Sequence, residues 1–503
     1  MRRRDIHDPF RRVIPLILAG SVAWGSCRAE TLGEAIALAY ESNPTLQAQR
    51  ASLRALDETY VQAGAGYRPT ATLQGTVTTD ANNYTGVERP LPGTSQQVLQ
   101  KQSQSSGVAI GVTQPLYTGG RVGAQISAAR ADILAGRETL RGTEETILRY
   151  VINAFADVRR DQQIVVILEA DVKLLLTQRD ESRARFEVGD ITRTDLAQTD
   201  ARVAASQSQL SRARAQLANS RAVYASIVGR NPENLAPEPP LAPYLPTSLD
   251  KALDWAERNS PHISQADFTE RASAAKLAGA KAQTRPTVSL QGSAGFSGGT
   301  FANNGITGIP SNGLGTPFRH YSHDETASIV ATIPIFTGGL TSSQIRQAAE
   351  TNNADRIGIE TARRQVLLTV AQAWNGLTGA RASLADDEAQ VQAANAAYEG
   401  ARQEARVGLR STYDVLISEE NLSAAQLEML NARHDEYVSG ADLLAATGAL
   451  YARDFAPGAT IYDPKTNLDH ARRAWPWSPW GAAVSQIDAL GVPHLDAGPA
   501  PPP

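Results

Sequence analysis

The pattern of apolar and polar residues along the chain has two periods, and the shorter one predicts strands. In four segments apolar residues alternate with small or polar ones, as Leu73 and Val77 do in TATLQGTVT. The four segments are 70–78, 107–117, 288–296 and 327–336. Polar residues fill 80–106 and 298–324, which we expect to be loops. Short segments of this kind are typical of strands with lipid on one face and water on the other.

The longer period predicts unusually long helices. No proline interrupts 121–188 or 340–407, and a helix of such a length would measure about 100 Å at 1.5 Å per residue. Beyond each run, apolar residues recur every seven positions: Leu196, Val203, Leu210, Leu217 and Tyr224 in one case, and Val415, Leu422 and Met429 in the other. This spacing favours coiled-coil packing over an ordinary amphipathic helix. A shorter helix is expected over 32–66, with a break at SNPTL.

The chain contains this plan twice. Residues 31–75 align with 248–292 at a constant offset, so that Pro69 pairs with Pro286. QPLYTGGR and IPIFTGGL follow at matching places, and their glycines are expected to turn strand into helix: Gly119, Gly120, Gly338 and Gly339. The predicted units are a first repeat at 30–230, a proline-rich linker at 231–247, a second repeat at 248–451 and a tail at 452–503. The tail either wraps the equator of the helical part or is partly disordered.

Each long run ends in a short polar tip. EVGDITRTDLAQ at 187–198 matches RVGLRSTYDVLI at 406–417, and an aspartate stands six positions after the glycine in both. Glycine allows the chain to reverse where a Cβ would clash. The tips therefore predict helical hairpins, with reversals at Val188 and Gly189 and at Val407 and Gly408. Asp195 and Asp414 either serve a functional entrance or simply cap the following helices.

The N-terminal segment and the composition restrict the class of protein. Arginines, an apolar run from Val13 to Trp24 and small residues are typical of a secretory signal peptide, which we assign to 1–29. Cys27 is the only cysteine; it is either removed with that peptide or lipidated. The net charge of −4 gives no basic field for nucleic acid.

The sequence offers little for catalysis. The seven histidines are scattered, and His320 and His323 fall in a predicted loop. No glycine-rich phosphate loop and no nucleophilic serine motif is present. We therefore expect no enzyme activity, no cofactor and no metal site.

Four strands per chain cannot close a barrel, and open sheet edges cannot face lipid. The expected fold is therefore an α+β membrane protein that assembles as a homotrimer. Its 12-stranded transmembrane β-barrel would continue into a long periplasmic α-helical coiled-coil barrel. The alternative is a periplasmic coiled-coil structural or adaptor protein without a pore.

The signal peptide, the TGG turns, the duplicated strand pairs and the VGxxxxxD tips together resemble TolC-type outer-membrane channel proteins over roughly 30–450. Tyr117 and Phe336 before the turns are similar to the type I secretion branch. The resemblance implies a passive duct in the outer membrane of a Gram-negative bacterium, extending into the periplasm. Its implied partners are a periplasmic adaptor, an inner-membrane ABC or proton-driven transporter, and outer-membrane lipid. It would export secreted protein or small molecules.

The resemblance also implies roles for residues at the tips. Thr194 and Asp195 would form a gate link with Arg410, and Asp414 would form an acidic ring in the pore. The adaptor would contact both reversals, at Val188, Gly189, Val407 and Gly408. The chain departs from the family pattern at Ala405, where a tyrosine helps to close the entrance, and at Ile417, where a second acidic ring would stand.

Overall fold

The computed structural model describes residues 29–85, 98–232, 234–303, 321–474 and 480–489. The predicted signal peptide and Cys27 lie outside these ranges, apart from Ala29. The strands are β1 (Thr70–Thr85), β2 (Val98–Tyr117), β3 (Thr287–Asn303) and β4 (Tyr321–Thr332). The helices are α1 (Leu32–Ser42), α2 (Pro44–Ala65), α3 (Arg121–Glu187), α4 (Arg193–Val228), α5 (Leu249–Asn259), α6 (Pro261–Ala282), α7 (Leu340–Arg406), α8 (Thr412–Ala446), α9 (Ala452–Phe455), α10 (Lys465–Ala474) and α11 (Gly481–Asp488), with a 3-10 turn at Ala242–Tyr244.

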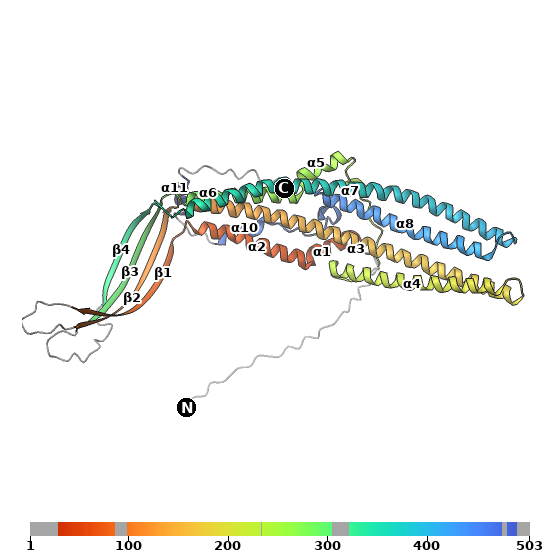
Figure 1. The fold of residues 1–503 in the computed structure, drawn as a ribbon, viewed down its shortest axis with the longest axis horizontal. Helices are drawn as coiled ribbons and strands as arrows, with labels where there is room; N and C mark the ends of the chain where they lie inside the picture. Colours follow the sequence, from red (N-terminus) through yellow and green to blue (C-terminus); the bar gives the residue numbers. More distant parts are fainter. Residues whose placement is uncertain (1–28, 86–97, 233, 304–320, 475–479, 490–503) are drawn as a thin grey trace, which may run out of the picture.

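The four strands form one antiparallel sheet in the order β1-β2-β3-β4 at one end of an elongated molecule (Figure 1). The register places Leu73 opposite Ile110, Ile110 opposite Ala294, and Leu290 opposite Ile329. Residues directly opposite each other point to the same face. One face therefore carries apolar residues on all four strands, although Glu325 lies opposite Ala294 on that face, and the predicted alternation is confirmed.

The expected loops 80–106 and 298–324 are wrong in extent. Strand pairing continues through 80–85 and 98–106, and through 298–303 and 321–324, although these stretches are polar. Backbone hydrogen bonds extend the ladder without an apolar face, so the side-chain pattern does not reveal these parts. The expected strand 327–336 ends instead at Thr332, ahead of Pro334, which has no N–H to donate.

Two helical hairpins, α3–α4 and α7–α8, extend away from the sheet, and both reversals lie at the opposite end of the molecule (Figure 1). The uninterrupted runs are confirmed, because α3 and α7 each have 67 residues. The seven-residue spacing is confirmed on α4, where the side chains of Val203, Leu210, Leu217 and Tyr224 are buried. Leu196 and Met429, near the predicted ends of the pattern, are only half-buried.

The short helices extend the hairpins toward the sheet. Asn43 breaks the predicted first helix in two; its Oδ1 accepts from Thr45 N, and its Nδ2 donates to the carbonyl of Ile227 at 3.0 Å. This bond joins the start of α2 to the end of α4. A core of residues from α1, α3, α4, α8 and the tail surrounds this junction, including Ile36, Phe155 and Leu444.

The tail returns along the first repeat. Asn467 of α10 donates to the carboxylate of Asp57 on α2 at 2.8 Å, and Asp488 of α11 lies in the strand-to-helix turn before α3. The described part of the tail is thus packed on α2 and the turn. None of the helices in the described ranges is both long and apolar enough to span a bilayer.

Candidate functional site: the two hairpin tips

The first tip reverses the chain within five residues. Gly189 has φ +80°, a conformation that costs other residues roughly 1–2 kcal/mol. Its N–H donates to the carbonyl of Phe186 at 3.0 Å, and Asp190 N–H donates to Arg185 at 2.9 Å. The guanidinium of Arg185 also lies 2.6 Å from the Asp190 carboxylate. The reversal is therefore held by its own residues.

The start of α4 is a capping box. The Thr192 hydroxyl accepts from Asp195 N–H at 3.2 Å, while Asp195 Oδ2 accepts from the N–H and the hydroxyl of Thr192 at 2.9 and 2.8 Å. The hydrogen bond from the backbone of Thr192 lowers the pKa of Asp195, and the hydroxyl of Thr192 adds to this effect. The carboxylate is therefore charged at neutral pH. Thr194 beside it is exposed.

The second tip repeats this geometry. Gly408 again has φ +80°, and Leu409 N–H donates to the carbonyl of Glu404 at 2.9 Å. Ser411 caps α8 and exchanges hydrogen bonds with Asp414, whose Oδ2 lies 2.7 Å from the Ser411 hydroxyl. That hydroxyl is the main cause of the lowered pKa of Asp414.

Within one chain the predicted gate residues lie apart. Arg410 Nε contacts Glu404 at 2.5 Å, and no hydrogen bond or ion pair between Arg410 and Asp195 occurs among the described residues. Both tip aspartates act as helix caps, which is the alternative that the sequence left open. The Thr-x-x-Asp and Ser-x-x-Asp spacings carry the signal that could have found Thr192 and Ser411.

The tips also expose apolar side chains. Val188 is 80% exposed, Val407 70% and Leu409 77%, all within the reversals or beside them. Ile417 is 37% exposed one turn into α8, at the position where a second acidic ring would stand. Exposed valine and leucine on otherwise polar tips provide a surface that a protein partner could cover.

Above the tips, a buried polar cluster joins the two hairpins. Arg202 of α4 lies 3.4 Å from Glu419 of α8; Glu419 is buried, and the side chain of Arg202 is 11% exposed. Burial raises the pKa of Glu419 to about 8, and a hydrogen bond to the neighbouring Asp171 adds to this effect against the charge of Arg202. Sequence reasoning missed this cluster, because its members are far apart in the chain.

The described residues contain no group of three or more histidine, cysteine, aspartate or glutamate side chains that could hold a metal. His320 lies outside the described ranges, and His323 stacks on Phe296 and pairs with Glu325 at 3.1 Å. The features that remain are two exposed tips, long paired helices and a sheet with one apolar face. They are the features of an outer-membrane channel component.

Comparison with known proteins agrees with that class. Residues 35–230 and 252–449 each match the family model described as outer membrane efflux protein, and the chain belongs to that family. The outer membrane efflux protein BepC of Brucella suis is 31% identical over 461 residues, covering 92% of this chain and 94% of BepC. Outer membrane protein TolC of Escherichia coli is 23% identical, covering 88% of both chains. The solved structure of the outer-membrane channel OprN shares the fold, with a TM-score of 0.68 at 19% identity, over 84% of this chain and 90% of OprN.

Proposed function

We propose that three copies of the chain form one passive exit duct through the outer membrane. The sheet carries this proposal: one of its faces has apolar residues on each of the four strands, while β1 and β4 stand at its edges with no further strand beside them in the described chain. Open edges cannot face lipid, because each unpaired backbone group there costs several kcal/mol. Three sheets arranged around a threefold axis would close into a 12-stranded barrel with a lumen.

The unequal burial of the two repeats supports a neighbouring copy. Of the 67 residues in α3, 23 are buried, whereas only 5 of the 67 in α7 are. The first TGG turn is buried, and the second is exposed throughout, with Ile335 at 96% and Phe336 at 88%. Equivalent sequences with such different exposure support the view that α7, although it packs on α5, α6 and α8, and its turn have a further face that a neighbouring copy covers.

The internal duplication predicts that partner. Within one chain, α6 of the second repeat packs against α3 of the first, and the guanidinium of Arg285 donates to the carbonyl of Gly119 at 3.1 Å. Arg68 occupies the position of Arg285 in the first repeat, and Gly338 occupies that of Gly119 in the second. We therefore expect α2 of one copy to pack against α7 of the next, with Arg68 on Gly338.

Disulfide trapping tests this contact with a matched control. A Cβ at Gly279 would lie 3.6 Å from that of Ala124, within disulfide range, so Gly279→Cys with Ala124→Cys should bond inside one chain. The equivalent pair across copies is Gln62→Cys with Ser343→Cys, and it should give covalent dimers and trimers on non-reducing gels. If only the control pair forms, the proposed packing is wrong.

The tips would form the periplasmic entrance of this duct. We expect Arg410 to lie near Thr194 and Asp195 of an adjacent hairpin in the assembly, as a weak gate link, since exposed ion pairs contribute little to stability. Arg410→Ala or Asp195→Ala should then raise single-channel conductance in planar bilayers. Arg406→Ala, an exposed change one residue before Val407, serves as the control. Equal conductance in all three variants and the parent would argue against the gate link.

Asp414 would face the pore axis, where three carboxylates attract cations. Asp414→Asn should weaken the block of conductance by multivalent cations added on the periplasmic side. An unchanged block would mean that Asp414 does not line the constriction. The apolar residues Val188, Val407 and Leu409 would contact a periplasmic adaptor, which links the duct to an inner-membrane ABC or proton-driven transporter. The name of BepC favours efflux, and secreted protein is the alternative cargo.

The bilayer measurement also separates the duct from the periplasmic coiled-coil alternative. A duct should fractionate with the outer membrane and conduct ions. A water-soluble protein that gives no conductance would overturn the proposed function.

A further inference from the structure

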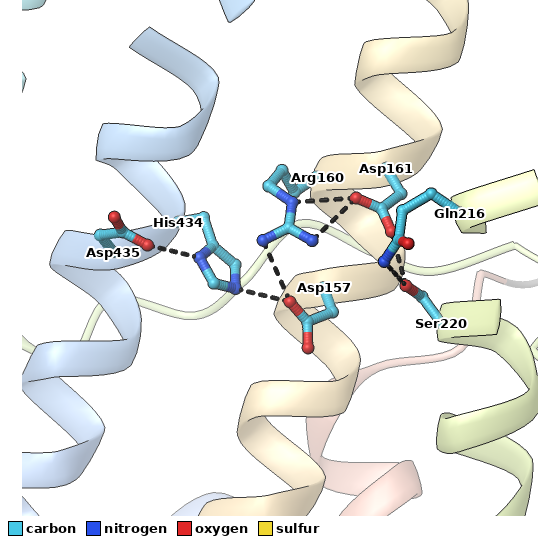
Figure 2. Close-up of polar contacts among 7 residues, drawn as sticks. All are labelled: Asp157, Arg160, Asp161, Gln216, Ser220, His434 and Asp435. Atoms are coloured by element: carbon cyan, nitrogen blue, oxygen red, sulfur yellow. Dashed lines mark hydrogen bonds and ion pairs between the residues drawn. The ribbon is translucent and has the colours of Figure 1, made fainter. Parts of the chain in front are cut away.

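A chain of polar contacts crosses three helices of both hairpins (Figure 2). It begins on α8 with Asp435 and His434, continues on α3 with Asp157, Arg160 and Asp161, and ends on α4 with Ser220 and Gln216. Each member contacts the next at between 2.5 and 3.4 Å. The path joins the second hairpin to both helices of the first.

His434 is the only member of the path that changes charge near neutral pH. Its Nδ1 lies 2.9 Å from Asp435 Oδ1, and its Nε2 lies 3.0 Å from Asp157 Oδ1, with 12% of the side chain exposed. Both ring nitrogens therefore face carboxylates. Only the imidazolium carries a proton on each nitrogen, so this form suits the site.

The charged side chains around His434 set the direction in which its pKa is shifted. Burial lowers the pKa of His434, but Asp157 and Asp435 outweigh burial and the nearby Arg160, so the pKa is raised above 6.5. Asp161 is paired with Arg160 on the far side. The remaining charged or titratable side chains of the surrounding pocket come from α7, α8 and the linker: Arg381, Arg433, Glu436, Tyr437 and Glu238. Arg381 pairs with Glu436, and Arg433 pairs with Glu388.

The middle of the path is well connected on the α3 side. Arg160 binds Asp161 through Nε and Nη2, both at 2.9 Å, and approaches Asp157 at 3.2 Å through Nη1. Asp161 is 2% exposed and accepts from the Ser220 hydroxyl of α4. Thus α3 and α4 stay joined whatever the charge of His434, and only the step from α3 to α8 depends on the imidazole.

We propose that protonated His434 acts as a latch that holds α8 against α3 within one chain and releases it when the proton leaves. Loss of the proton leaves one of the two carboxylates facing a nitrogen lone pair, which is repulsive. The part of α8 around His434 is then freer to move relative to α3, while the Arg202–Glu419 contact nearer the tips is unaffected. The effect of this movement on transport rests on the proposed function, but the latch itself does not.

The sign of the pH dependence follows from linkage. The latched form binds the proton more tightly, so latching is complete at acid pH and is lost as the pH rises through the raised pKa of His434. The ratio of released to latched chains should rise by up to about tenfold per pH unit over the transition.

Spin-label distances between the hairpins test the latch in the full-length protein. Labels would be placed at Val166→Cys on α3 and Glu428→Cys on α8, both exposed, with Cys27 replaced by serine and labelled chains diluted with unlabelled ones. The parent should give a narrow distance distribution at about pH 5 and a broad one above neutral pH. The distance distribution of His434→Gln should be broad at every pH. That of His262→Gln, a matched change on α6, should respond to pH like the parent.

Two results would overturn the latch: a parent distribution that does not change with pH, or the same pH response in His434→Gln. Asp157→Asn removes the same contact from the α3 side and decides the question if His434→Gln does not fold. Conductance of the parent, measured in parallel, separates this inference from the proposed function. A conducting protein without the pH response refutes only the latch, and a pH response without conductance refutes only the duct.

Discussion

The buried carboxylate of Asp488 connects the tail to the turn between sheet and helices, and its removal should loosen that turn. Asp488 is 1% exposed. Its Oδ1 accepts from Thr118 N–H at 2.5 Å and from Gly120 N–H at 3.2 Å. Its Oδ2 accepts from the hydroxyls of Thr118 and Tyr67 at 2.9 and 3.0 Å. The backbone N–H groups just before α3 thus donate to a carboxylate that is about 370 residues away in the chain.

The free-energy cost of removing the Asp488 carboxylate can be estimated from these hydrogen bonds. A hydrogen bond to a charged group contributes about 1.5–3 kcal/mol, and a buried donor left without an acceptor costs about 1–3 kcal/mol. Asp488→Ala leaves two backbone N–H groups without an acceptor, so local opening should become about 3–5 kcal/mol easier. Asp488→Asn keeps one acceptor oxygen and should cost about half as much.

Hydrogen–deuterium exchange measures this opening directly. Amides of Thr118 and Gly120 should exchange at least about 100-fold faster in Asp488→Ala, since 1.4 kcal/mol is tenfold. Asp469→Asn, an exposed change on α10, should leave them unchanged. If the amides stay protected in Asp488→Ala, another contact, such as that of Arg285 with Gly119, holds the turn and the reasoning fails.

Three further predictions concern the hairpins. Thr192→Ala and Ser411→Ala should each cost about 1 kcal/mol of stability through loss of a helix cap, measured by urea unfolding. Gly189→Ala should destabilise by about 1–2 kcal/mol because of its positive φ, although its Cβ would meet nothing; the control Gly400→Ala, inside α7, should instead stabilise by about 0.5–1 kcal/mol. The raised pKa of Glu419, about 8, means that stability falls as pH rises from 4.5 toward that value; Glu419→Gln should flatten this fall in melts across pH, and an unchanged slope would contradict it.

Periodicity made most of the fold predictable. Alternation located the four strands, because successive side chains of a strand point to opposite faces and one of these faces is apolar. The seven-residue spacing of Val203, Leu210 and Leu217 located a helix packed along its length. The polar ends of the strands had no such signal, since their pairing depends on backbone groups that every residue carries.

The contacts that join distant segments could not be predicted. Asp488 meets Thr118, and Arg202 meets Glu419, through the tertiary fold alone, and no local spacing marks either pair. His434 likewise has no distinguishing neighbour in the sequence beyond Asp435. The capping boxes at the tips, by contrast, are visible as short patterns in the sequence, and they include Asp195 and Asp414.

The capping role of the tip aspartates does not exclude a role at an entrance. In Asp195 and Asp414, the hydrogen bonds that cap the helix all fall on Oδ2. Among the described residues no hydrogen bond reaches either Oδ1, and both carboxylates carry a lowered pKa. The cap therefore fixes the position and charge of each carboxylate while one oxygen stays available. A cationic group arriving from a neighbouring hairpin, or a cation in the pore, would find an acceptor whose orientation is already set.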